Sequence, residues 1–294
     1  MCGRFTSLTP PEELAEIFST APLNPQLFDE FQPNFNVPPT TRITAVAQDA
    51  QGIRKLGRFQ WGLVPTWAKD ASGSARCINA RSETVHEKPS FRSSVPTKRC
   101  IIPMDGFYEW QTIGITASSP PKPKQPVYVT RRDRKPLAVA GLWASWRDRS
   151  LGDSAPWWHS CCVITTQAND TMSPIHDRMP VILEAPDWDD WLNVGGGSHT
   201  ATQIQRITEL MIPADPSILV PQWVSTDVNA VRNNRPDLIT PIKIKGSAGI
   251  MSSVIRCIGV AVCEPAPTFN HSSQSSASRM TGMRSWIGDI VSLA

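Results

Sequence analysis

The chain has 294 residues and a formal net charge of +3, from 29 Lys and Arg against 26 Asp and Glu. Hydrophobic residues make up 40% and charged residues 19%, which excludes a highly charged, disordered chain and allows one large domain or two ordinary ones. The first residues lack the basic and apolar regions of a secretory signal, and the late apolar stretch 248–263 is too short to cross a bilayer. We therefore expect neither export nor a membrane partner.

The first predicted element is a short amphipathic helix after Thr9. Thr9 is expected to cap it, two prolines fall in its first turn, and apolar residues then recur at helical spacing. Residues 21–42 follow with five prolines, so we expect an extended loop there with few ladder hydrogen bonds.

Six strand-like segments come next, each a short β-branched or aromatic run bounded by Gly, Pro or Asp. Most succeed one another without an intervening helix, which favours mixed or antiparallel sheets over a doubly wound fold. Two later helices are predicted, one opened by Pro186 and one over Ala201–Met211, so the fold class is α+β. The six segments are Ile43–Gln48, Leu56–Leu63, Arg99–Pro103, Pro126–Thr130, Leu137–Trp146 and Cys161–Thr166.

Two segments are predicted to lie outside the core. Residues 114–125 are rich in Pro, Ser and Lys and are expected to form an exposed connection between two strands. Residues 244–294 are rich in Ser, Gly and Met without a clean period, which is typical of a disordered tail.

Cys2 is a candidate reactive residue because removal of Met1 would place a thiol beside a free α-amine. Such an amine can capture an aldehyde as a Schiff base, and the adjacent thiol can then close a thiazolidine ring. The same pair can also act as an N-terminal nucleophile in amide hydrolysis. An incidental residue at a frayed terminus is the structural alternative.

Three further residues are candidates for acid, base or orienting roles. Asn79 follows a strand end, and Glu109 lies among aromatic residues, where lost hydration would raise the pKa of its carboxyl group. His176 is predicted in a loop between Ile175 and Asp177. The alternatives are a solvated strand Glu and a structural His.

Cofactors are not indicated. The seven Cys and five His show no C-x-x-C, H-E-x-x-H or H-x₃₋₅-H spacing, so we expect no metal, and no glycine-rich phosphate motif predicts a nucleotide cofactor. No disulfide framework follows either, and the vicinal Cys161 and Cys162 are expected to fill the core.

Arginines near these loops, interleaved with aromatic residues, match what a single-stranded nucleic acid requires, namely phosphate pairing and base stacking. A buried role for the aromatics and a solvated role for the arginines is the alternative. The residues concerned are Arg4, Arg76, Arg81, Arg92, Arg99 and Arg178, with Trp61, Trp67 and Phe91.

Several segments in one order strongly resemble the SRAP family, the SOS response-associated peptidases. They are MCGRFT (1–6), FNVPPTT (35–41), WGLVPTWAKD (61–70), INARSET (78–84), CIIPMDGFYEW (100–110), AVAGLW (138–143), ITTQANDTMSPIHDRMPVIL (164–183) and VSTDVNAVRNNRPDLITPI (224–242). The resemblance implies one SRAP domain over residues 2–243, with sheets curled into a barrel-like core flanked by helices.

The resemblance also implies a function, the shielding of abasic sites in single-stranded DNA. Cys2 would attack the ring-opened sugar aldehyde and end as a thiazolidine DNA–protein crosslink. Asn79 would position the amine, Glu109 would shuttle protons, and His176 would assist sugar-ring opening and crosslink reversal. The family's thiol peptidase label, a hydrolase activity beside this lyase-type chemistry, rests on the same Cys2.

DNA-binding residues are carried over in the same way. Arg4, Arg81 and Arg178 are similar to backbone-contacting or site-organising residues. The groove residues implied are Asn36, Pro39, Trp67 and Thr165. Ala68 stands where some relatives carry a second Trp, which would remove one stacking ring.

Two other functions remain open, a cysteine peptidase acting on a peptide and a non-covalent binder of single-stranded DNA. The expected partner is single-stranded DNA with abasic sites, bound by a monomer. The wording of the motifs predicts a nuclear protein if the source is eukaryotic and a cytoplasmic one otherwise.

Overall fold

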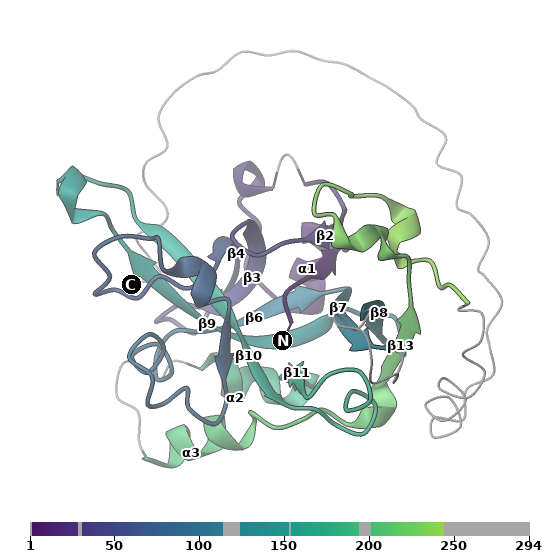
Figure 1. Cartoon of the computed structure of the whole chain (residues 1–294). Helices are drawn as coiled ribbons and strands as arrows, with labels where there is room; N and C mark the ends of the chain where they lie inside the picture. Colours follow the sequence, from purple (N-terminus) through teal and green to yellow (C-terminus); the bar gives the residue numbers. More distant parts are fainter. Residues whose placement is uncertain (1, 29–30, 114–123, 153, 194–200, 244–294) are drawn as a thin grey trace. The chain divides into compact units, whose positions relative to one another are not determined.

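The computed structural model describes residues 2–28, 31–113, 124–152, 154–193 and 201–243, which form two β-sheets with short flanking helices (Figure 1). The strands of the first sheet, in spatial order, are β13 (Leu219–Trp223), β8 (Lys124–Arg131), β7 (Gly106–Thr112), β1 (Phe5–Ser7) and β2 (Asn34–Val37). All four of its strand pairs are antiparallel.

The second sheet is mixed and closes on itself. Its path runs β11 (Arg178–Pro180), β10 (Trp158–Gln167), β4 (Arg54–Trp61), β3 (Arg42–Gln48), β6 (Arg99–Met104), β9 (Leu137–Trp146) and β12 (Ile182–Leu183), with β5 (Asn79–Arg81) beside β10. A further pairing of β10 with β9 joins β10, β4, β3, β6 and β9 into a ring. The expected curled, barrel-like core corresponds to this ring.

Strand β10 organises the region where the candidate residues gather. Its first half pairs with β9 and with β4, while its second half pairs with β11 and with β5. The β10–β4 and β10–β5 pairs are parallel, and the other two are antiparallel. Every residue of β10 from Ser160 to Thr166 is buried, which explains the continuous apolar run that predicted this strand.

The core lies inside the ring and between the two sheets. Phe5 of β1 meets Trp61 of β4 edge to face, with ring centroids 5.2 Å apart. Cys161 and Cys162 are both fully buried free thiols, in agreement with the prediction that they fill the core. The helices α1 (Pro11–Ile17), α2 (Trp188–Leu192) and α3 (Ala201–Glu209) contribute Leu14, Trp191 and Ile207 to the hydrophobic cluster that contains Cys162.

The α+β class and all six predicted strands are confirmed, and both late helices form, although α2 begins at Trp188 after a 3-10 turn at Ala185–Asp187. The loop expected over residues 21–42 is partly wrong. It contains the strand β2, which ends just before Pro38. This strand lies at the edge of its sheet and needs ladder hydrogen bonds on one side only, so it can form in a proline-rich segment.

The expected helix cap is also wrong. The residue before α1 is Pro10, and no side chain caps the helix. Thr9 instead donates its hydroxyl to Oδ1 of Asp105 over 2.5 Å, and its main-chain N–H donates to Oδ2 of the same carboxylate over 3.1 Å. Asp105 stands in the turn between β6 and β7, so a distant residue competes for the capping hydroxyl.

The connection predicted over 114–125 is bounded as expected by β7 and β8, but residues 114–123 lie outside the described part. The tail predicted over 244–294 also lies outside it. Within the described ranges no helix is long and apolar enough to cross a membrane.

Candidate functional site

Cys2 lies directly before β1, and its side chain is fully buried. Burial raises the pKa of its thiol far above the ordinary value, and the carboxylate of Glu109 raises it further, while a hydrogen bond from the main chain of Arg4 lowers it. The thiol is therefore neutral near pH 7 and needs a proton acceptor before it can react.

Asn79 holds the main chain at Cys2. It is the first residue of β5, in register with Val163 of the parallel strand β10, and its Nδ2 donates to the carbonyl oxygen of Cys2 over 2.8 Å. Its Oδ1 is buried and accepts no hydrogen bond from the residues described. A free acceptor thus stands on the same amide that already holds Cys2.

Glu109 stands in the middle of β7, opposite Val127 of β8, and is 2% exposed. Burial raises the pKa of its carboxyl group, and the negative charge of Asp177 adds to the rise, whereas the charge of His176 opposes it. The strand begins at Gly106, where a Cβ would come within 2.5 Å of the Tyr128 ring, so only glycine permits this approach.

His176 lies just before β11, with Nε2 4.0 Å from Oε2 of Glu109. Its Nδ1 is 3.0 Å from the main-chain nitrogen of Arg178 and 2.8 Å from Oδ1 of Asp177. Without a proton Nδ1 accepts the main-chain bond, and with one it donates to the carboxylate, so either ring nitrogen can carry the proton.

These four residues form one cluster, which we call the Cys2 cluster: Cys2, Asn79, Glu109 and His176. The amide of Asn79 touches Cys2, the charge of Glu109 acts on the Cys2 thiol, and His176 faces Glu109. They come from β5, β7 and the segments before β1 and β11, which lie far apart in the chain.

Arg178 lies beside the Cys2 cluster and is held by Glu83, which was not among the residues singled out from the sequence. Its Nη1 and Nη2 lie 2.6 and 2.9 Å from the two carboxylate oxygens of Glu83, and Nη2 also donates to the carbonyl oxygen of Thr165 over 2.7 Å. The available signal was that Glu83 belongs to the same INARSET segment as Asn79 and Arg81.

Arg4 is anchored by Asn36, with Nη1 donating to Oδ1 over 2.6 Å and to the carbonyl oxygen of Val228 over 3.0 Å. Burial lowers the pKa of Arg4, and its guanidinium lies 5.9 Å from the ring centre of Trp110. Asn36 is 1% exposed and its Nδ2 also bonds three main-chain carbonyls. It therefore supports Arg4 from within the protein.

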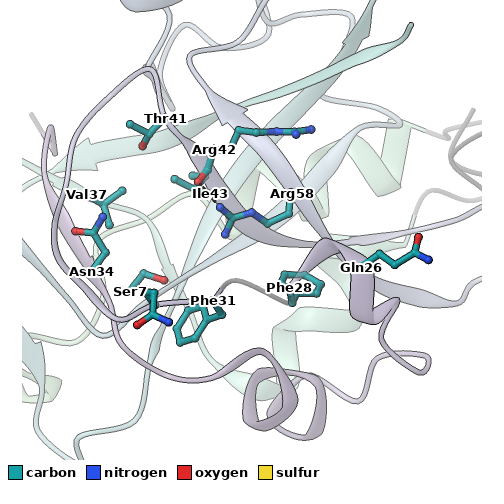
Figure 2. Close-up of a pocket in the computed structure, with 11 residues that line it drawn as sticks. Ser7, Gln26, Phe28, Phe31, Asn34, Val37, Thr41, Arg42, Ile43 and Arg58 are labelled. Carbon is teal, nitrogen blue, oxygen red and sulfur yellow. Dashed lines mark hydrogen bonds between the residues drawn. The ribbon is translucent and has the colours of Figure 1, made fainter. Parts of the chain in front are cut away.

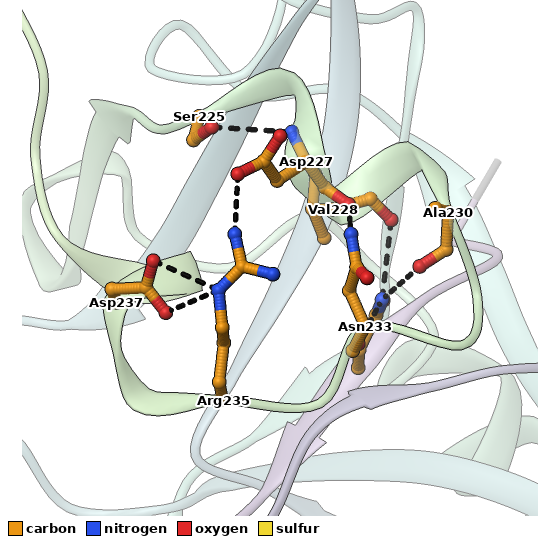
Figure 3. Close-up of polar contacts among 8 residues, drawn as sticks. Ser225, Asp227, Val228, Ala230, Asn233, Arg235 and Asp237 are labelled. Carbon is orange, nitrogen blue, oxygen red and sulfur yellow. Dashed lines mark hydrogen bonds and ion pairs between the residues drawn. The ribbon is translucent and has the colours of Figure 1, made fainter.

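The carbonyls that Asn36 binds belong to the segment 225–237, which folds around its own polar contacts (Figure 3). Arg235 lies between Asp227 and Asp237, with Nε 2.8 Å from Oδ1 of Asp237 and Nη2 in contact with Asp227. Residues 224–242, the last of the segments that resemble the SRAP family, thus help to position Arg4 through the carbonyl oxygen of Val228.

The other predicted groove residues differ in exposure. Trp67 is 63% exposed while its Nε1 donates to the carbonyl oxygen of Pro89 over 3.2 Å, so the ring is held by one edge. Arg81 is exposed at the end of β5, and Pro39 is half-buried in the turn before β3. Thr165 is fully buried, with its hydroxyl 3.4 Å from the carbonyl oxygen of Ala80.

Three of the proposed DNA-facing residues are structural, and one of them is Phe91, which is buried in the hydrophobic core. Trp61 is fully buried, and so is Arg99, whose guanidinium donates to the carbonyl oxygens of Val95 and three other residues. The prediction that Arg99 faces nucleic acid was wrong, because all residues of β6 are buried and Arg99 is the first of them. Among the described residues, no group of three or more His, Cys, Asp or Glu is placed to hold a metal ion.

The fold and the Cys2 cluster define a two-sheet α+β protein with a buried cysteine site at the second residue of the chain. The family model described as "SOS response associated peptidase (SRAP)" matches residues 1–231 of this chain. The chain belongs to the SRAP family.

Relatives in bacteria and vertebrates are similar over most of the chain. YoqW of Bacillus subtilis, named an abasic site processing protein, is 38% identical over 239 residues, which cover 81% of this chain and 99% of that protein. HMCES of Xenopus tropicalis, with the same descriptive name, is 30% identical over 84% of this chain and 78% of its own length.

The fold is also similar to solved structures. A protein from Bacteroides thetaiotaomicron superposes with a TM-score of 0.70 at 23% identity, covering 82% of this chain and all of that one. A phage-related protein from Bordetella bronchiseptica gives a TM-score of 0.55 at 28% identity, covering 76% and 94%.

Proposed function

We propose that this protein processes abasic sites in single-stranded DNA by forming a covalent thiazolidine crosslink through Cys2. The relatives named as abasic site processing proteins support the class of substrate. The observation that carries the chemistry is the amide of Asn79, which binds the Cys2 carbonyl and keeps Oδ1 free beside it. After removal of Met1, the new α-amine of Cys2 is the natural donor for that oxygen.

The proposed reaction has two bond-forming stages. The neutral amine attacks the aldehyde carbon of the ring-opened sugar, and loss of one water gives an imine. The sulfur then adds to the imine carbon while its proton reaches the nitrogen, which closes the five-membered ring. The net change is one molecule of water released, and no oxidant or reductant is needed.

Glu109 and His176 supply the proton steps. A carboxyl group with a raised pKa holds a proton more readily than an ordinary carboxylate and can both accept and return one, and the neutral thiol of Cys2 requires such an acceptor. His176 faces Glu109 and can carry a proton on either nitrogen, which suits protonation of the sugar ring oxygen during opening. Reversal would use the same groups in the opposite order.

Damage specificity in this proposal comes from the aldehyde, because an intact strand offers no such electrophile. Arg81 and Arg178 lie on or beside the strands that carry the Cys2 cluster and would pair with phosphates, while the exposed ring of Trp67 would stack on a base. Non-covalent affinity should therefore fall steeply as salt rises.

The test is incubation of the mature protein with a single strand carrying one abasic site. We expect a product that survives denaturation and whose mass equals protein plus DNA minus one water. Cys2→Ala should abolish it. Cys2→Ser, like Cys2→Ala, keeps the α-amine and lacks only the thiol, so either variant should give an adduct that survives denaturation only after borohydride reduction of the imine. Cys77→Ser, which alters a half-buried free thiol, is the matched control.

Three results would reject the proposal. An undiminished product in Cys2→Ala would show that another group reacts. A peptide cleaved in a Cys2-dependent way without any DNA product would favour the peptidase, and salt-sensitive binding with no covalent species would favour a simple binder. Intact-mass measurement of the N-terminus must accompany each assay, since a retained Met1 or an acetyl group removes the amine.

A further inference from the structure

A cavity of about 540 Å³ lies around the far end of β1, away from the Cys2 cluster. Its walls come from Ser7, from Gln26, Phe28, Phe31 and Gln32, and from strands β2, β3 and β4 (Figure 2). Its volume falls within the roughly 300–1,000 Å³ of small-molecule sites. None of the four residues of the Cys2 cluster lines it.

Two arginines on neighbouring strands give this cavity a positive wall. Arg58 donates from Nη2 to the carbonyl oxygen of Arg42 over 3.0 Å, and from Nη1 to Oγ1 of Thr44 over 3.3 Å. Neither arginine has an ion pair with a carboxylate among the described residues. Burial lowers the pKa of Arg58, and the charge of Arg42 lowers it further, so the two cations repel each other without a counter-ion. An anion between them would relieve this repulsion.

Two aromatic rings face these charges from the other side of the cavity. Phe28 and Phe31 are joined by a main-chain hydrogen bond of 2.8 Å, which sets both on one turn. Figure 2 shows Arg58 between Arg42 and the pair of rings, with the amides of Gln26 and Asn34 at the margins. Rings stack on planar groups, and amides can recognise the polar edge of such a group.

From this arrangement we propose that the cavity binds a 5′-phosphorylated nucleotide. The phosphate contacts Arg42 and Arg58, and the base lies against Phe28 and Phe31. Inorganic phosphate would use only the arginines, and an uncharged nucleoside would use only the rings. The nucleotide can come from two sources, a free mononucleotide or one unit of a bound DNA strand.

This site is independent of the proposed crosslinking function. Ser7 lines the cavity five residues after Cys2, which corresponds to about 16 Å of extended chain. The two functions can therefore fail separately. At saturating DNA, loss of nucleotide binding would leave the covalent product at Cys2 intact, and Cys2→Ser would leave nucleotide binding intact.

Calorimetric titration tests the ligand class, with deoxyadenosine monophosphate, deoxyadenosine and inorganic phosphate as probes. We expect the monophosphate to bind at least about tenfold more tightly than either fragment. Arg42→Gln and Arg58→Gln should each weaken it by about tenfold. Arg149→Gln, at an exposed arginine outside the cavity, should leave it unchanged.

Arg42 is the safer variant because its side chain is exposed, whereas Arg58 is half-buried and its replacement needs a thermal-unfolding check. Equal binding of nucleoside and monophosphate would overturn the proposal. Unchanged monophosphate affinity in folded Arg42→Gln and Arg58→Gln would also overturn it.

A second titration separates the two sources, using Cys2→Ser protein and undamaged single strands of increasing length. If the strand is the source, longer strands should displace the monophosphate, and Arg42→Gln should weaken only the longer strands. If the source is a free mononucleotide, strands of every length should bind Arg42→Gln as they bind the parent protein. The site would be rejected if Arg42→Gln bound both the strands and the monophosphate with the same affinity as the parent protein.

Discussion

Asn79 donates its side-chain amide to the main-chain carbonyl oxygen of Cys2 over 2.8 Å, which ties the first residues of the chain to strand β5. The position of the candidate nucleophile is therefore set by a strand 77 residues further along the chain. The β5 strand is in turn held in parallel register by β10, so Cys2 is located by the second sheet as well as by its own β1.

Replacing Asn79 should slow crosslinking without unfolding the protein. Asn79→Ala removes the bond to Cys2 and the free Oδ1, so we expect the rate of covalent product formation to fall about 10–100-fold, as misplacement of a reacting group typically does. The rate is measured by quenched gel assays under single-turnover conditions. Asn24→Ala, at an exposed asparagine, serves as control, and a parent-like rate in Asn79→Ala would contradict the role given to this amide.

Glu83 should restrain DNA binding, because its carboxylate occupies the two guanidinium nitrogens of Arg178 that would face a phosphate. Glu83→Gln removes that competing charge while the bond from Arg178 to the Thr165 carbonyl remains. We expect non-covalent affinity for a single strand to rise by about 2–5-fold at low salt, and less at high salt. Fluorescence anisotropy on the Cys2→Ser background measures it.

The matching change, Arg178→Gln, should lower the same affinity and flatten its salt dependence. Glu87→Gln removes an exposed carboxylate nearby in the chain and controls for net charge. Equal gains from Glu83→Gln and Glu87→Gln would mean that only net charge matters.

Arg99 should matter for stability and not for DNA. Its guanidinium is buried and satisfies carbonyls from the segment before β6 and from α2, including the 2.5 Å bond to Trp191. Arg99→Gln leaves several of these acceptors unpaired, so we expect a loss of about 3 kcal/mol in the free energy of unfolding. Urea denaturation measures the loss, Arg76→Gln is the exposed control, and a weaker salt dependence of DNA binding in folded Arg99→Gln would contradict this assignment.

Glu109 should make stability depend on pH in a defined direction. Burial raises the pKa of this carboxyl group above its reference of 4.5, so the folded state holds the proton to higher pH than the unfolded chain does. The associated stabilisation is complete below pH 4.5 and is lost as pH rises through the raised pKa. The free energy of unfolding of Glu109→Gln should therefore gain on that of the parent protein as pH rises across this window.

Denaturant titrations at a series of acid to neutral pH values measure this difference. Glu87→Gln, at an exposed position, should show no such trend. A free energy of unfolding of Glu109→Gln that falls relative to that of the parent as pH rises would show the opposite sign and would place the charged form of Glu109 in a favourable site.

Local patterns predicted the strands whose neighbours are mainly apolar, but not the features that depend on distant partners. The run at β10 is buried on both faces and is visible as a continuous β-branched segment. The short strands β1, β2 and β5 carry no such run and are held by their ladders. Thr9 was predicted to cap the first helix, but its hydroxyl and main-chain N–H donate instead to Asp105, 96 residues away, and no side chain caps the helix.

In the candidate site too, the residues with a local chemical signal could be predicted, and the contacts between distant segments could not. Cys2, Glu109 and His176 were singled out by chemistry that local context suggests, and the structure brings them together with Asn79. The inward direction of Arg99 and the pairing of Glu83 with Arg178 depend on tertiary packing, so no short segment could reveal them.

Thr165 lies in register with Arg81 on one side of β10 and with Pro180 on the other. Strand β10 therefore sets the register of both β5, which carries Asn79, and β11, which carries Arg178. An insertion of a single residue beside Thr165 would turn every later side chain of β10 to the opposite face and shift β11 relative to β5. Longer connections at the sheet ends would leave the register of β10 unchanged. Engineering of altered lesion preference should accordingly vary the connections and preserve the alignment of β10.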